Sequence, residues 1–163
     1  GNLFDVRQKR NLTEERMDKL SAVPFDQLPL KNAFTQVRGN GNRKLVVFAD
    51  PNCGYCKRFE KDLQKLDNVT ISHVLYPILG EDSKVKSKNI WCARDKAKVW
   101  NDWMINGTPP PSASCDTAPI EANVEFGKKH RITGTPTLFF ADGTRVVGAV
   151  PLAQIENQLA QVK

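Results

Sequence analysis

The chain alternates between short runs of β-branched and apolar residues and longer stretches in which apolar residues recur at helical spacing. One β-branched run covers residues 45–49 and another covers 69–77, and between them Phe59, Leu63 and Leu66 recur at intervals of four and three. The runs are typical of strands, and the spacing between them is typical of a helix with one apolar face. We therefore predict a βαβ unit with two parallel strands.

Upstream of this unit the pattern is weaker. Residues 1–6 resemble the end of a strand, and Thr13 can cap a helix that the first proline ends. A strand is expected at residues 33–37. The sequence Gly-Asn-Gly-Asn at residues 39–42 indicates a turn, which could join that strand to the next apolar run as a hairpin.

Downstream of the unit we expect one long helix from about Asp82 to Ile105. Trp100 and Trp103 share one face of this helix and should pack in the core. Three consecutive prolines then exclude a helix or a central strand. The remaining elements are expected to be a helix at residues 119–129, a strand through Phe140, a hairpin turn at Asp142-Gly143, a strand at 145–150 and a helix from Pro151.

Length and composition indicate one domain of ordinary size, because 163 residues with 40% hydrophobic content suffice for a core. No apolar run approaches the roughly 18 residues of a membrane-spanning helix, so membrane insertion is not expected. A formal charge of +6 would allow contact with nucleic acid, but the Lys and Arg residues are scattered and no aromatic-basic platform is present. We expect a basic protein that does not bind nucleic acid.

Two cysteines, Cys53 and Cys56, stand where the first strand of the βαβ unit meets its helix. Pro51 separates the two elements, which places Cys53 at the helix N-terminus. Unpaired N–H groups and the helix dipole stabilise a thiolate there. One such thiol can attack a disulfide while the other resolves the product. A zinc site would need further ligands that no second Cys-x-x-Cys or close His pair supplies, so we expect neither a metal nor a cofactor.

The other two cysteines, Cys92 and Cys115, lack the spacing of a reactive motif. The even number of cysteines favours a structural disulfide between them, and hence an oxidising compartment. The alternative is two buried free thiols in a cytosolic protein. His73 lies in mid-strand without a sequence neighbour for a triad or a metal site, which favours a satisfied, partly buried histidine over a catalytic base.

The order of the elements resembles an α/β thioredoxin-like fold, a central mixed sheet flanked by helices, with a helical insertion at about residues 82–130. Within that superfamily, the chain resembles the catalytic domain of periplasmic disulfide isomerases of the DsbC and DsbG kind. The residues that carry the resemblance are Phe48-Ala49-Asp50-Pro51-Asn52-Cys53-Gly54-Tyr55-Cys56, Ile90-Trp91-Cys92-Ala93, Ala113-Ser114-Cys115-Asp116 and Gly134-Thr135-Pro136. The Cys-Gly-Tyr-Cys motif favours the DsbC side.

The resemblance implies a role for each residue of this motif. Cys53 is expected to be the nucleophile and Cys56 the resolving thiol, and Gly54 and Tyr55 support the active site between them. These roles agree with the helix N-terminal position of Cys53, where a thiolate is favoured.

The resemblance also assigns residues outside the motif. Cys92 and Cys115 would form the structural bridge, and Thr135-Pro136 would be a cis-proline turn that faces the active cysteines and pairs with an extended substrate strand. One departure is Val47, six residues before Cys53, where thioredoxins carry a buried acid. A buried proton acceptor of the thioredoxin kind is therefore not expected.

Members of this family carry an N-terminal dimerisation domain and a linker helix, and residues 1–24 are similar to the end of that region. Residues 25–163 would form the catalytic domain. The full-length protein would be a homodimer and this chain a monomer. The resemblance further implies a periplasmic protein, exported through a removed signal peptide, that acts on mis-disulfided secreted proteins and is reduced by a membrane thiol reductant of the DsbD type.

Isomerisation or reduction of incorrect disulfides is the leading interpretation of these features. A net oxidase of the DsbA kind would use the same residues and differ in its redox partner. A third interpretation is a non-catalytic chaperone that binds partners in an apolar cleft around Pro51, Tyr55, Tyr76 and Pro136.

Overall fold

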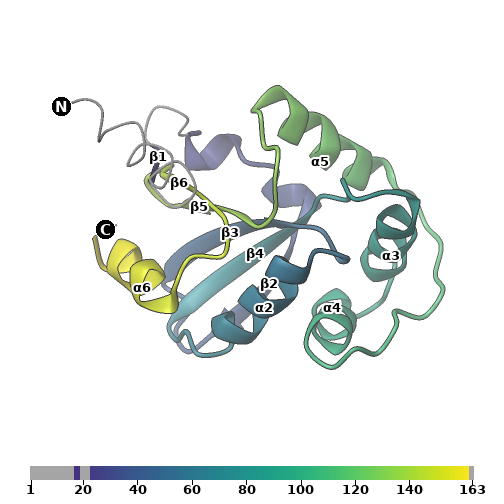
Figure 1. The fold of residues 1–163 in the computed structure, drawn as a ribbon, viewed down its shortest axis with the longest axis horizontal. Helices are drawn as coiled ribbons and strands as arrows, with labels where there is room; N and C mark the ends of the chain where they lie inside the picture. The colour runs from purple at the N-terminus through teal and green to yellow at the C-terminus, as the bar shows by residue number, and fades with distance from the viewer. Residues whose placement is uncertain (1–16, 19–22, 162–163) are drawn as a thin grey trace, which may run out of the picture.

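The computed structural model describes residues 17–18 and 23–161. Six strands form one mixed sheet in the order β1-β6-β5-β3-β4-β2, with helices on both faces (Figure 1). The strands are β1 (Met17–Asp18), β2 (Phe34–Arg38), β3 (Arg43–Ala49), β4 (Val69–Leu75), β5 (Thr137–Phe140) and β6 (Arg145–Val147). The helices are α2 (Gly54–Leu63), α3 (Glu81–Trp91), α4 (Lys96–Met104), α5 (Ala118–Lys129) and α6 (Leu152–Gln161), with 3-10 turns η1 (Phe25–Gln27) and η2 (Leu30–Asn32). This is the mixed α/β sheet that the sequence predicts.

Strand β3 lies in the interior of the sheet because residues 45–48 are all apolar and can be buried on both faces. Its parallel neighbour is β4, in the register Leu45 to Ile71, and α2 connects the two strands. Its antiparallel neighbour is β5, in the register Val47 to Leu138. The predicted βαβ unit is therefore confirmed, and it places the Cys-x-x-Cys motif at the end of an interior strand.

Two hydrophobic cores lie on opposite faces of the sheet. One lies under α2, α4 and α6 and contains Phe59, Trp100 and Ile155. The other lies under α5 and the two 3-10 turns and contains Phe48 and Tyr76. Because side chains alternate along β3 and β4, each strand contributes to both cores. The residues that point toward α2 are thus fixed by the register of the strands.

The hairpin expected around residues 39–42 is wrong. Strand β2 pairs antiparallel with β4, in the register Phe34 to His73, so β4 lies between β2 and β3. A turn signal specifies that the chain reverses, but it does not specify which strand becomes the neighbour. Here the parallel partner of β3 occupies the position that a hairpin would have given to β2.

The single long helix expected from Asp82 to Ile105 is also wrong, because two helices occupy this range. Helix α3 ends at Trp91, and Cys92 is its C-cap residue. Asp95 then caps α4, with its carboxylate accepting a hydrogen bond from Lys98 N at 3.2 Å. The apolar spacing continues across the break, and for that reason periodicity alone does not detect it.

The helix expected after Thr13 is wrong at Met17–Asp18, which form β1 and pair antiparallel with β6. The outer edge of β6 offers unpaired backbone groups that such a strand satisfies. Residues 13–16 and 19–22 of that predicted helix and the strand end expected at residues 1–6 lie outside the described residues, and Val23 is not helical. The hairpin of β5 and β6 and the final helix α6 agree with the prediction. In the part of the chain that the structure describes, no helix has the length and apolarity needed to span a bilayer.

Candidate active site

Cys53 is the N-cap residue of α2, as the sequence predicts. Its backbone N–H donates to Asp50 O at 3.1 Å, and its sulfur accepts a hydrogen bond from Cys56 N at 3.1 Å. The sulfur therefore occupies the place of a capping oxygen, where it receives one of the otherwise unpaired N–H groups of the first turn. Both cysteines are present as free thiols.

The two thiols have opposite ionisation behaviour. A hydrogen bond from the Cys56 side chain is the largest cause that lowers the pKa of Cys53, to about 6, against the opposing effect of burial. Hydrogen bonds from the Thr135 side chain and from the backbone of Cys56 and Tyr55 lower this pKa further. Burial, followed by the hydrogen bond and charge of Cys53, raises the pKa of Cys56 far above its ordinary value. One thiol is thus prepared as a nucleophile while the other holds its proton.

Access to the two sulfurs differs little. The position of Cys53 at the helix N-terminus predicts an exposed thiol, but its exposed fraction is only 6%, against 1% for Cys56. Tyr55 between them is 62% exposed and lies beside the Arg58 guanidinium. Cys53 is therefore nearly covered and lies close in the sequence to an exposed aromatic side chain.

The segment Thr135-Pro136 lies against Cys53. The peptide bond between the two residues is cis, as expected, and the Cys53 thiol donates to Thr135 O at 3.4 Å. Gly148 N donates to Pro136 O at 2.9 Å, which ties the segment to the chain after β6. The structure thus brings Thr135, which is 82 residues from Cys53 in the sequence, next to the two thiols of the motif.

Asp50 is a site residue that the sequence analysis did not single out. It is fully buried, and its carboxylate accepts hydrogen bonds from Asn52 N, Ile78 N, Leu79 N and Ser83 Oγ at 2.7–2.9 Å. These bonds join the loop before Cys53 to the loop after β4. An aspartate directly before a proline at the end of a strand is a signal for such a turn.

Trp103 also supports this loop, although it was expected to pack in the core with Trp100. Trp100 is fully buried, whereas Trp103 is partly buried and donates from Nε1 to Pro51 O at 2.6 Å. The ammonium groups of Lys57 and Lys86 lie 4.3 and 4.9 Å from the centroid of its ring. A spacing of three residues places both tryptophans on one face of a helix, but it does not show whether that face contacts the core or the active-site loop.

His73 differs from the expectation of a satisfied, partly buried side chain. It is 1% exposed, and its Nε2 lies 2.9 Å from Glu60 Oε2, a partner from α2 that the sequence could not identify. Its Nδ1 is buried without a hydrogen-bond partner. The strand register places His73 beside Val47, on the face of the sheet that α2 covers.

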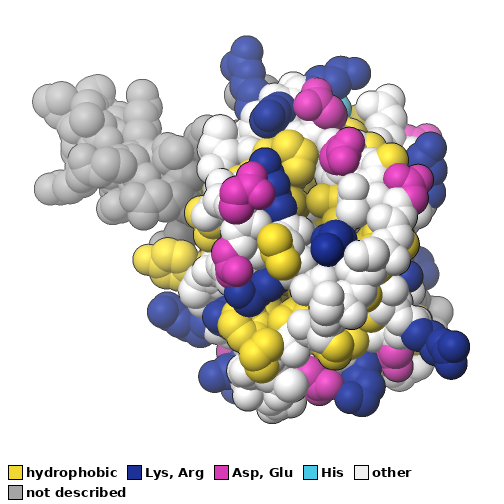
Figure 2. Space-filling model, turned by 90° about the vertical axis from the view of Figure 1, so that its right-hand side faces the viewer, with side chains coloured by type: hydrophobic (Ala, Val, Ile, Leu, Met, Phe, Trp, Pro, Cys, Tyr) yellow, Lys and Arg dark blue, Asp and Glu magenta, His cyan; other side chains and the backbone are white. Residues whose placement is uncertain are grey.

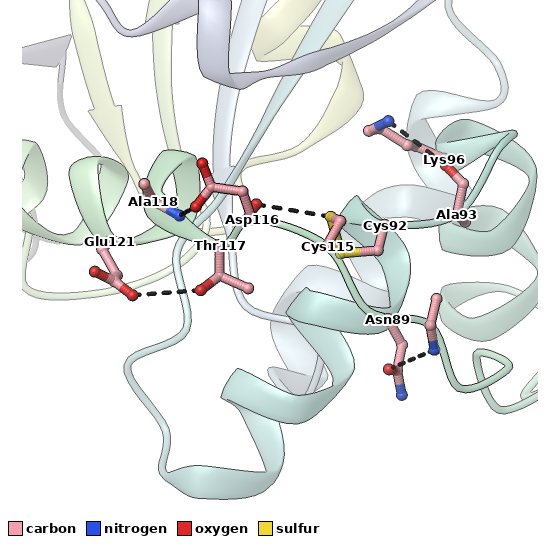
Figure 3. Close-up of a disulfide and its surroundings, with 10 residues drawn as sticks. Asn89, Cys92, Ala93, Lys96, Cys115, Asp116, Thr117, Ala118 and Glu121 are labelled. Atoms are coloured by element: carbon pink, nitrogen blue, oxygen red, sulfur yellow. Dashed lines mark hydrogen bonds between the residues drawn. A yellow bond between two sulfur atoms is a disulfide. The ribbon is translucent and has the colours of Figure 1, made fainter.

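Cys92 and Cys115 are joined in a disulfide, 23 residues apart in sequence (Figure 3). Asn89 Oδ1 accepts a hydrogen bond from Ala113 N at 3.1 Å beside this bond. The bridge fastens the proline-rich return segment to the end of α3.

Tyr76 does not belong to the apolar cleft expected for a chaperone. Its side chain is 2% exposed in the core beneath α5, and its hydroxyl donates to Ile132 O at 2.7 Å. Pro51 and Pro136 are buried as well. Of the four residues proposed for that cleft, Tyr55 alone is exposed.

A separate shallow groove lies between α3 and α5. It is lined by Pro77, Lys84, Val85, Lys88, Thr117, Ile120, Glu121, Val124 and Glu125. Figure 2 shows this side of the molecule, where hydrophobic side chains lie between separate basic and acidic ones and no continuous basic stripe forms. Among residues 17–18 and 23–161, no group of three or more His, Cys, Asp or Glu side chains could hold a metal ion.

Comparison with known proteins places this geometry in a family. Residues 30–163 match the family model of the thioredoxin-like domain. A probable thiol:disulfide interchange protein DsbC of Bordetella parapertussis is 50% identical over 98% of this chain and 57% of its own length. The thiol:disulfide interchange protein DsbC of Escherichia coli is 32% identical over 71% of this chain and 50% of its own length. The chain thus spans little more than half the length of these curated relatives.

Solved structures give the same result. The crystal structure of a disulfide interchange protein from Neisseria gonorrhoeae superimposes with a TM-score of 0.76 at 38% identity, covering 81% of this chain and 96% of the other. The thiol-disulfide exchange protein alpha-DsbA2 of Wolbachia pipientis shares the fold, with a TM-score of 0.69 at 18% identity over the whole of both chains. The chain therefore belongs to the thioredoxin-like family, and its curated relatives within that family are thiol:disulfide interchange proteins of the DsbC type.

Proposed function

We propose that this chain is the catalytic domain of a thiol:disulfide oxidoreductase that isomerises or reduces incorrect disulfides in secreted proteins. The observation that carries the proposal is the pairing of Cys53, with its pKa lowered to about 6, with Cys56, which keeps its proton. A thiolate at neutral pH beside a protected second thiol is what disulfide exchange requires.

In the proposed reaction, the Cys53 thiolate attacks one sulfur of a substrate disulfide and forms a mixed disulfide, and the other substrate sulfur leaves as a thiolate. If a substrate thiolate then attacks the mixed disulfide, the substrate is isomerised and Cys53 is released unchanged. If the Cys56 thiolate attacks Cys53 Sγ instead, the substrate is reduced and Cys53 and Cys56 become a disulfide. That disulfide accepts two electrons from an external dithiol, for which a membrane reductant of the DsbD type is the proposed partner.

The surrounding residues have supporting roles in this proposal. Gly54 and Tyr55 form the first turn between the cysteines, and Thr135-Pro136 shapes the wall beside Cys53, where an extended substrate would lie. The Cys92–Cys115 bridge is assigned a structural role because it lies apart from the motif. The bridge also favours an oxidising location, and the proposed location is the periplasm, reached by a signal peptide that is removed.

We further propose that residues 1–24 belong to the end of an N-terminal dimerisation region, that residues 25–163 form the catalytic domain, and that the longer protein is a homodimer. This proposal is supported by the similarity to a longer relative, because the matched region covers 98% of this chain but only 57% of that relative. Refolding of scrambled ribonuclease in a glutathione buffer tests it. The chain alone should exchange disulfides slowly, the chain fused to a dimerisation domain should restore ribonuclease activity faster, and Cys53→Ala should abolish both effects.

Two further assays separate the alternatives. A net oxidase would accelerate the oxidation of reduced ribonuclease more than the rearrangement of the scrambled form. A non-catalytic chaperone would suppress aggregation equally well with Cys53→Ala. Equal rates for wild type and Cys53→Ala in the scrambled assay would refute the proposed function.

A further inference from the structure

Glu60 and His73 form a buried ionisable pair under the candidate active site. Each side chain is 1% exposed, and Nε2 of His73 lies 2.9 Å and 3.2 Å from the two carboxylate oxygens of Glu60. Burying a carboxylate in a hydrophobic core is costly even with a partner, and an apolar pair of similar volume often serves stability equally well. The pair is therefore a candidate for a chemical role.

The pair lies one helical turn below Cys56. Glu60 follows Cys56 by four residues on α2, and both belong to the buried face of that helix. Residues at this spacing have Cβ atoms about 5–6 Å apart. Long helical side chains project toward the helix N-terminus, which directs the Glu60 carboxylate toward the turn that contains Cys56. His73 reaches the same place from β4, in register with Val47 of β3.

The elements around the pair present uncharged side chains to it. Phe34 of β2 stacks on the His73 ring with centroids 5.1 Å apart, and Trp100 of α4 lies 5.5 Å from that ring. Val47 is the neighbour from β3. The charged groups of these elements have partners elsewhere: Arg38 of β2 bonds Gln64, Arg43 of β3 pairs with Glu156, and Lys98 of α4 pairs with Asp102. On the buried face of α2, Cys56 is the titratable side chain besides Glu60.

Resolution of a mixed disulfide requires Cys56 to lose its proton in a place that bulk water does not reach. We propose that the Glu60–His73 pair accepts this proton, an inference that rests on the proposed function. The thiol proton moves to the Glu60 carboxylate, the Cys56 thiolate attacks Cys53 Sγ, the new disulfide forms, and the substrate sulfur leaves as a thiolate. When the disulfide is reduced again, Glu60 returns the proton to Cys56. His73 holds the carboxylate through Nε2 and is a positioning residue.

Ellman's reagent separates this step from the first attack. With one equivalent of reagent, Cys53 releases one thionitrobenzoate and retains the other as a mixed disulfide, and attack by Cys56 then releases the second. We expect Glu60→Gln, which keeps an acceptor for His73 Nε2, to leave the first phase within about twofold. The second phase should slow about tenfold or more at pH 7, since positioned general bases contribute at least that much. The deficit should shrink as pH rises, because hydroxide can then remove the proton.

Phe59→Leu is the matched control, because Phe59 is the adjacent buried residue of α2 and has no ionisable group. Its second phase should follow the wild-type pH profile. The proposal is overturned if the second phase of Glu60→Gln stays within twofold of wild type, or if Phe59→Leu slows it equally. Absence of a first phase in wild type would contradict the proposed function instead.

A measurement on wild type does not depend on how the variants fold. The chain has two histidines, and His130 lies at the end of α5 beside Phe126, in the region of the opposite core. Ring ¹⁵N chemical shifts recorded at neutral pH should differ for His73 between the dithiol and disulfide forms, because the protonation of its Glu60 partner differs, while those of His130 stay the same. Identical His73 shifts in both forms would overturn the proposal.

Discussion

Cys53 and Cys56 lie one helical turn apart, yet their surroundings shift the pKa values of the two thiols in opposite directions. The sulfur of Cys53 lies at the end of α2, where it receives the N–H of Cys56 at 3.1 Å. The sulfur of Cys56 lies on the buried face of the helix. Position along one turn of helix therefore decides which thiol ionises at neutral pH.

The first prediction concerns the hydrogen bond from the Cys56 thiol, the largest cause of the lowered pKa of Cys53. In wild type, the rate of alkylation of Cys53 by iodoacetamide should rise with a midpoint near pH 6. Cys56→Ser, which retains a donor, should keep a similar midpoint. Cys56→Ala, which removes the donor, should move the midpoint upward. Identical midpoints in the two variants would mean that the backbone of the helix end lowers the pKa without help from the Cys56 side chain.

A second prediction concerns Asp50, whose buried carboxylate accepts hydrogen bonds from Ile78 N, Leu79 N and Ser83 Oγ. Asp50→Ala leaves these donors without an acceptor and should lower the free energy of unfolding by roughly 3 kcal/mol, measured by urea denaturation. The matched control is Asp82→Ala, since the Asp82 carboxylate is exposed and accepts from Lys86 at the surface. It should leave the free energy of unfolding close to that of wild type, because exposed ion pairs contribute little. Similar losses in both variants would exclude a special role for Asp50.

At the scale of single residues, the sequence predicts the positions of the two thiols better than the contacts of the buried residues around them, Asp50 and His73. The motif and the proline before it identify Cys53 and Cys56 through local rules. The partners of Asp50 come from the loop after β4, and the partner of His73 comes from α2. Such contacts depend on register and packing between elements, which no local pattern encodes.

At the scale of elements, the sequence predicts the parallel pair β3 and β4 and the hairpin of β5 and β6, but not the place of β2 or the break between α3 and α4. Strand β2 pairs with β4 and strand β5 pairs with β3, so both neighbours of β3 come from later in the chain. The break between α3 and α4 depends on Asp95, which is the N-cap of α4. An aspartate inside a continuous apolar pattern does not by itself indicate that a new helix begins there. These choices are made by tertiary packing, which overrides local preference.

A third prediction concerns the Cys92–Cys115 bridge, which closes a loop with a sequence separation of 23. Replacing both residues by serine should lower the free energy of unfolding by about 3 kcal/mol, because the unfolded chain regains the entropy of that loop. Urea denaturation should be measured with Cys53 and Cys56 also replaced by serine, so that no other disulfide forms. The parent with only these two active-site replacements is the control. A loss below about 0.5 kcal/mol would show that α3 and α5 hold the segment without the bond.

At the scale of the whole molecule, the ionisation of one thiol is coupled to the stability of the fold. The pKa of Cys53 is about 6 in the folded protein and 9.0 for an unperturbed cysteine. A lowered pKa means that the folded state binds the proton less tightly than the unfolded state. The resulting stabilisation is complete above the unfolded pKa and is lost as pH falls toward 6.

The fourth prediction follows from this coupling. Mildly reduced wild type should melt at a higher temperature relative to Cys53→Ser at pH 8 than at pH 5, because serine has no thiolate to stabilise. Calorimetry at several pH values measures the difference, and Cys56→Ser serves as a reference whose Cys53 thiol still ionises. A difference between wild type and Cys53→Ser that does not change with pH would contradict the lowered pKa.

The most direct test of the account is to trap the intermediate that it requires. Reduced Cys56→Ala should accumulate a mixed disulfide with a disulfide-containing substrate protein, joined through Cys53, because the resolving thiol is missing. Peptide mapping by mass spectrometry identifies the joined cysteine. Cys53→Ala should form no such adduct at neutral pH, since Cys56 keeps its proton. An adduct at Cys56 in Cys53→Ala, or none at Cys53 in Cys56→Ala, would contradict the assignment of nucleophile and resolving thiol.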